Sequence, residues 1–170
     1  MYSLFCLSSI FGQRHVVLII ADDLGADYLG FYPNHGDTAR TPFLRSLMNK
    51  SVLFTDATAN PYCSATRATY FTGRYAFRTG VGAVVGGGAG SGSLDTSEFA
   101  LPELIAANDK NIVRGHIGKW HLHNPMPQSN LMLPQQFGIQ HFEGPFIGSL
   151  SSYTNWTSIS KIAIYTSFTS

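Results

Sequence analysis

The stretch His-Val-Val-Leu-Ile-Ile-Ala-Asp-Asp-Leu-Gly, residues 15–25, decides the fold class that the sequence predicts. Residues 15–21 form a short, continuous apolar run rich in β-branched side chains. Such a run is typical of a strand buried on both faces, as in a parallel sheet covered by helices. The sequence therefore predicts an α/β fold with a largely parallel central sheet flanked by helices.

Two adjacent carboxylates, Asp22 and Asp23, follow at the carboxyl end of this predicted strand. Open α/β sheets bind their ligands at that end of the strands. Neighbouring like charges repel each other, and either solvent or a bound cation relieves the repulsion. On these residues alone, an acidic turn and a metal site both remain open.

A second informative stretch is Cys-Ser-Ala-Thr-Arg-Ala-Thr-Tyr-Phe-Thr-Gly-Arg, residues 63–74. Cys63 follows a turn-forming Asn-Pro pair and opens a segment with helical character, so its side chain should lie near a helix N-terminus, which favours anions. Arg67 lies one turn later on the same face, and its planar guanidinium suits a tetrahedral oxyanion. A lone cysteine is more often a small buried apolar residue. Together, however, these features indicate a sulfate or phosphate site.

Lys119 and His121 follow a predicted strand at residues 112–118. Because the two residues are two positions apart, they would project from the same face of an extended segment. That face could offer a cation and a second donor to one anion. The alternative is that Lys119 and His121 are exposed surface residues with no such role.

The rest of the chain gives weaker signals. We expect a helix capped by Thr41 with Pro42 in its first turn, a strand at residues 51–55, a mobile glycine-rich surface loop at 81–93, a helix at 101–107 and a loop at 124–136. Residues 149–170 receive no assignment.

Composition narrows the class of protein. The chain has 170 residues, 44% hydrophobic and 12% charged, which fits one domain with a real core and excludes a disordered polyelectrolyte. A formal net charge of +1 gives no electrostatic footprint for nucleic acid. Cys6 and Cys63 are too few for a disulfide framework. No run approaches the roughly 20 apolar residues of a transmembrane segment, and residues 1–14 make at best a weak signal peptide.

Residues 63–67, followed by Thr72-Gly73-Arg74, resemble the signature of the type I sulfatases, Cys-x-Pro-x-Arg followed by Thr-Gly-Arg. Ala65 stands where proline is commonest in that family. Further stretches resemble family elements in the family's order, and they are found at residues 17–25, 41–44, 118–122 and 137–144. The resemblance implies an alkaline-phosphatase-like fold of which this chain is the N-terminal portion, apparently truncated. It divides the chain into a poorly defined segment at 1–14, a sulfatase N-terminal domain at 15–148 and an unassigned tail at 149–170.

The resemblance also implies a site and a reaction. Cys63 would be oxidised to formylglycine (3-oxoalanine) by a formylglycine-generating enzyme, and it would join Asp22 and Asp23 as ligands of Ca²⁺. Arg67 would steady this nucleophile, and the groups that bind sulfate oxygens or assist the leaving group would be Lys119 and His121.

The implied activity is hydrolysis of aryl or carbohydrate sulfate esters, with a sulfated small molecule or glycan as substrate. Two alternatives remain open at this point: a phosphate or phosphonate monoester hydrolase of the same superfamily, and a non-catalytic sulfate- or glycan-binding remnant. The family implies a secretory, lysosomal, periplasmic or extracellular location.

Overall fold

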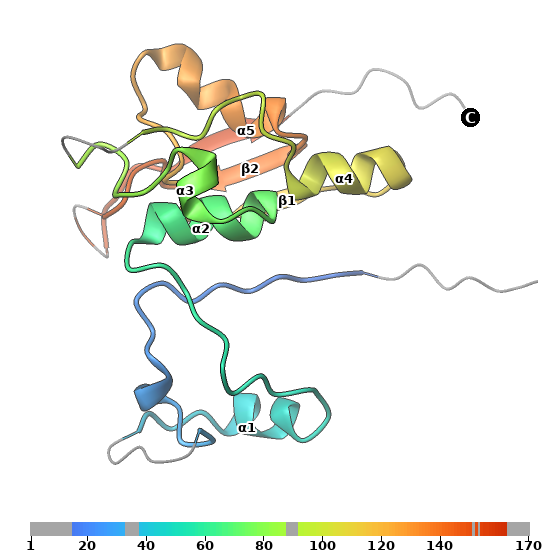
Figure 1. The fold of residues 1–170 in the computed structure, drawn as a ribbon, viewed down its shortest axis with the longest axis vertical. Helices are drawn as coiled ribbons and strands as arrows, with labels where there is room; N and C mark the ends of the chain where they lie inside the picture. The colour runs from blue at the N-terminus through green and yellow to red at the C-terminus, as the bar shows by residue number, and fades with distance from the viewer. Residues whose placement is uncertain (1–14, 33–37, 88–91, 151, 153, 163–170) are drawn as a thin grey trace, which may run out of the picture. The chain divides into compact units, whose positions relative to one another are not determined.

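The computed structural model describes residues 15–32, 38–87, 92–150, 152 and 154–162, with only the backbone of 161 and 162 (Figure 1). The chain divides into two compact units, Met1–Ser51 and Val52–Ser170.

The first unit contains a 3-10 helix, η1 (Ala26–Tyr28), and an α-helix, α1 (Pro42–Met48). The predicted helix after Thr41 is thus confirmed, although the Thr41 side chain makes no capping hydrogen bond. Proline suits the first turn because an N–H there has no partner within the helix. A parallel bridge between Leu29 and Ala39 joins the residue that follows η1 to the segment that precedes α1.

Two strand predictions are wrong. Residues 15–21 and 51–55 form no strand, and Val16 is 92% exposed. A strand is stabilised by hydrogen bonds to a neighbouring strand, and among the described residues none pairs with either stretch. An apolar, β-branched sequence is therefore compatible with a buried strand, but it does not determine whether a neighbouring strand is present to pair with it.

The second unit contains most of the regular structure. Its helices are α2 (Cys63–Thr72), α3 (Ala76–Thr79), α4 (Leu101–Asn108), η2 (Gln128–Met132) and α5 (Leu133–Gln136). The helices predicted from Cys63 and at 101–107 are confirmed. Residues 124–136 are not simply a loop, because they contain η2 and α5, in which Leu133 and Pro134 are buried.

The second unit also holds a sheet with the order β1 (Gly115–Ile117), β2 (His141–Gly144) and β3 (Ile159–Ile162). Strands β1 and β2 are parallel, with His116 opposite Phe142, whereas β2 and β3 are antiparallel. The described sheet is therefore small and mixed, and a largely parallel sheet is not confirmed. The α/β class is nevertheless supported. Strand β3 lies in the tail at 149–170, for which the sequence predicts no structure. Its Ile-Ser-Lys-Ile pattern is short and embedded in Ser- and Thr-rich sequence, so it gives no clear strand signal.

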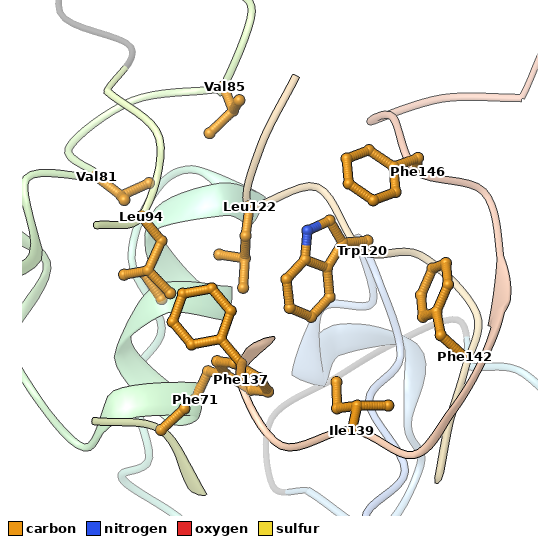
Figure 2. Close-up of a cluster of buried hydrophobic side chains, with 12 residues drawn as sticks. Phe71, Val81, Val85, Leu94, Trp120, Leu122, Phe137, Ile139, Phe142 and Phe146 are labelled. Carbon is orange, nitrogen blue, oxygen red and sulfur yellow. The ribbon is translucent and has the colours of Figure 1, made fainter. Parts of the chain in front are cut away.

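The core of the second unit is built around Trp120, which is 1% exposed. Its ring meets Phe71 of α2 edge-on at 5.4 Å between centroids, and Phe142 of β2 at 6.0 Å (Figure 2). Such edge-to-face pairs add to the free energy gained from burying the rings. The core thus joins α2, β2 and the turn after β1, and the residues on either side of Trp120 are positioned by it.

Candidate active site

The candidate site begins at the N-terminus of α2, where Cys63 is the first helical residue. Tyr62 precedes it in an extended conformation. The Thr66 hydroxyl donates to the Asn60 carbonyl at 3.1 Å and accepts from the Asn60 N–H at 3.0 Å, which ties the incoming turn to the helix. The helix ends at Thr72 and is capped by Gly73, whose φ of 69° suits glycine. Cys63 is half-buried at an end of the helix that favours anions.

His121 lies against Cys63, with its Nδ1 atom 3.2 Å from Sγ. Its other ring nitrogen, Nε2, lies 3.2 Å from the Val85 carbonyl oxygen. The backbone N–H of His121 donates to the Phe146 carbonyl at 3.1 Å. The imidazole is buried and contacts both the Cys63 side chain and the Val85 carbonyl.

The backbone at His121 is in the left-handed region, with a φ of 52°. The expectation that Lys119 and His121 project from one face of an extended segment is therefore wrong at this point, because the chain turns at His121. A non-glycine residue with positive φ is strained. Strain of this kind persists only where surrounding contacts hold it, as the Phe146 and Val85 contacts do here.

Arg67 is buried one turn along α2, and its Nη1 donates to the carbonyl of Lys119. The His116 Nε2 atom lies 3.2 Å from the same carbonyl. Burial, with the Arg67 charge as a smaller contribution, lowers the pKa of His116, and the Lys119 carbonyl opposes this. Arg67 therefore fixes the turn that carries Lys119 and His121. The Lys119 side chain itself is half-buried.

Asp22 and Asp23 lie in an exposed turn of the first unit, whereas Cys63, Arg67, Lys119 and His121 lie in the second. No group of three or more His, Cys, Asp and Glu side chains gathers within the described ranges. The donor chemistry of the two carboxylates suits calcium, a hard cation that binds oxygen.

Three residues that sequence reasoning did not select also belong to the site. The Val85 carbonyl contacts the His121 ring, and Ser64 accepts a hydrogen bond from the Val85 N–H at 3.1 Å. Gly148 lies where any Cβ atom would overlap the same ring. The glycine-rich segment was expected to be a surface loop, but its Val81 and Val85 are buried in the core. Its contribution is made through backbone atoms, which leave no pattern in a sequence.

Comparison with known proteins identifies the class. Residues 14–166 match the sequence model of the sulfatase family. The chain belongs to this family, whose members are sulfuric ester hydrolases.

Individual relatives agree with this assignment. The chain is 38% identical to human arylsulfatase D over 115 residues, which covers 64% of this chain and 19% of the relative. It is 37% identical to human steryl-sulfatase over 116 residues, covering 65% and 19%. Human arylsulfatase H matches at 32% over 148 residues, covering 82% and 26%. The chain therefore spans about a fifth to a quarter of the length of these relatives.

A solved structure, that of Ps i-CgsB, is similar over 55% of this chain and 19% of that chain, with 28% identity and a TM-score of 0.42. Within the described residues, no helix is both long and apolar enough to cross a membrane.

Proposed function

We propose that this chain hydrolyses sulfate esters of aryl or carbohydrate alcohols, with residue 63 as the nucleophile. The observation that carries the proposal is the contact between Cys63 and His121, made at the N-terminus of a helix. A nucleophile position, a group able to move a proton and backbone N–H groups that favour an anion are thereby combined. In this proposal, residues 15–148 form the sulfatase N-terminal domain that carries the site residues.

The proposed modification is oxidation of Cys63 to formylglycine by a formylglycine-generating enzyme. This group supplies a hydrated aldehyde, which offers one hydroxyl for attack on sulfur and a second whose ionisation expels the bound sulfate. The fit of residue 63 to this role is local, because its side chain is half-buried and lies within 3.2 Å of the His121 ring.

The chain's own groups would then act as follows. His121 accepts or returns a proton at the side chain of residue 63 through Nδ1. The Lys119 ammonium binds sulfate oxygens and stabilises the charge that develops as the alcohol leaves. Arg67 steadies this arrangement by holding the Lys119 carbonyl.

We further propose that Asp22 and Asp23 hold a calcium ion together with residue 63. Carboxylate oxygens are suitable ligands for calcium, which takes further oxygen ligands to reach six to eight. The cation would supply positive charge that lowers the cost of ionising a hydroxyl at residue 63.

The proposed substrate is a sulfated small molecule or glycan, and the aryl and steryl alcohols in the relatives' names support the former. A secretory, lysosomal, periplasmic or extracellular location fits because formylglycine is installed on such routes in the family.

The test is hydrolysis of a chromogenic aryl sulfate by the 170-residue chain, produced with a formylglycine-generating enzyme and checked by mass at residue 63. We expect calcium-dependent turnover that a chelator removes and that Cys63→Ala abolishes. A matched aryl phosphate should react more slowly. Faster phosphate turnover would favour a phosphomonoesterase. Sulfate binding without turnover, unchanged in Cys63→Ala, would favour a binding remnant.

A further inference from the structure

The residues around His121 form a closed ring of contacts. Cys63 Sγ lies 3.2 Å from His121 Nδ1, and His121 Nε2 lies 3.2 Å from the Val85 carbonyl. The Val85 N–H donates to the Ser64 hydroxyl at 3.1 Å, and Ser64 is covalently joined to Cys63. Ser64 and His121 are both buried, at 0% and 4% exposure. Solvent therefore has little part in fixing the imidazole.

The contact with the Val85 carbonyl favours one position for the proton on the His121 imidazole. A carbonyl oxygen only accepts hydrogen bonds, so contact with Val85 requires a proton on Nε2. In a neutral imidazole the other nitrogen then holds a lone pair. That nitrogen is Nδ1, which lies against residue 63.

Gly148 restricts the same ring sterically. A Cβ atom built on Gly148 would lie 2.3 Å from His121 Cε1 and 2.7 Å from Nε2. Gly148 does not have a left-handed φ, so alanine is compatible with its backbone and would act only through this contact. The absence of a side chain at residue 148 thus makes room for the imidazole.

We propose that Ser64 and Gly148 are positioning residues for His121. Ser64 holds the backbone at Val85 through the Val85 N–H, the carbonyl of the same residue holds the proton on Nε2, and Gly148 leaves the space in which the ring keeps that contact. As a result, the Nδ1 lone pair is directed at residue 63. The importance of this arrangement for catalysis rests on the proposed function, whereas the arrangement itself does not.

The test is ¹⁵N NMR of the histidine side chains in the 170-residue chain with Cys63 unmodified, at one fixed pH. In the wild type, His121 should show a protonated Nε2 and a bare Nδ1. In Ser64→Ala, the Val85 N–H loses its hydrogen bond, so the backbone at Val85 is held less firmly and His121 should become a mixture of both tautomers. Gly148→Ala should shift the Cε1–H resonance and weaken the same preference. Thr72→Val is the matched control, because it removes a hydroxyl of α2 that bonds to the Ala68 carbonyl, outside the ring of contacts.

A wild-type His121 protonated on Nδ1 would overturn the proposal. A folded Ser64→Ala or Gly148→Ala chain with wild-type His121 resonances would remove that residue from it, and if one variant does not fold, the other decides. The expected tautomer shift without sulfate hydrolysis would contradict the proposed function alone. Hydrolysis with an unchanged tautomer would contradict the positioning role alone.

Discussion

The apolar run at residues 16–20 and the apolar side chains around Trp120 are similar in chemistry and opposite in environment. Val16 is 92% exposed and Trp120 is 1% exposed. Trp120 is covered by Phe71, Phe137 and Phe142, which come from three separate segments of the second unit. No comparable set gathers on residues 16–20 among the residues that the structure describes.

This difference shows which residues of the candidate site have buried neighbours in the chain. Lys119 and His121 flank Trp120, and Arg67 lies beside the buried Ala68 of α2. The core therefore fixes these groups through their neighbours in the chain. Asp22 and Asp23 follow an exposed run, so their neighbours in the chain are not buried as Trp120 is.

The largest expected contrast is in stability. Trp120→Ala should cost about 3–5 kcal/mol of unfolding free energy because it empties the centre of the core. Ile19→Ala, at a residue that is 85% exposed, should cost less than about 0.5 kcal/mol. Urea unfolding followed by circular dichroism measures both. Similar costs for the two substitutions would contradict the comparison.

A smaller contrast is expected between two arginines of the second unit. Arg67→Met should cost about 1.5–3 kcal/mol, because a buried charge-assisted hydrogen bond to the Lys119 carbonyl is lost. Arg74→Met breaks an ion pair with Glu98 at a side chain that is 45% exposed, and it should cost less than about 1 kcal/mol. Denaturant midpoints of the two variants would settle the order. A larger loss in Arg74→Met would refute it.

The core should also make the second unit sensitive to acid. Burial lowers the pKa of His123 from 6.5. The Trp120 Nε1–H donates to His123 Nδ1 at 3.1 Å, and His123 Nε2 lies 2.7 Å from the Leu94 carbonyl. Since the unfolded chain binds the proton first, stability should be complete above pH 6.5 and fall below it.

The expected slope from this one histidine is at most about 1.4 kcal/mol per pH unit. Unfolding free energies measured across this range for wild type and His123→Gln provide the check. The variant should lose stability less steeply with acid, and an unchanged slope would show that His123 does not cause it.

The smallest effect on folding is expected in the exposed run. The double variant Val17→Lys and Ile19→Lys should change unfolding free energy by no more than about 0.5 kcal/mol, since neither side chain is buried. It should reduce self-association, because exposed apolar patches favour it. Analytical ultracentrifugation would detect this change. A marked loss of stability would mean that the run is packed in solution.

Sequence alone predicted the parts of the fold that depend on local signals. Helices α1, α2 and α4 begin where Pro42, Cys63 and Leu101 indicated. The strands at 15–21 and 51–55 were wrong because pairing depends on residues distant in sequence. The mixed sheet was missed because β3 lies in a segment with a weak pattern.

The same distinction holds for the site. The motif residues Cys63 and His121 were predicted, and the structure brings them together. The Val85 carbonyl could not be predicted, because backbone atoms have no residue signature. Nor could the turn at His121, whose positive φ contradicts the expected extended segment.

The central claim is that His121, and not the nearby His123, exchanges a proton with the side chain of residue 63. The most direct test compares kcat for aryl sulfate hydrolysis in His121→Asn and His123→Asn, at a temperature where both are folded. We expect His121→Asn to lose about 10²–10⁴-fold, while His123→Asn stays within the order of magnitude of the wild type. Equal losses in the two variants, or full activity in His121→Asn, would contradict the account.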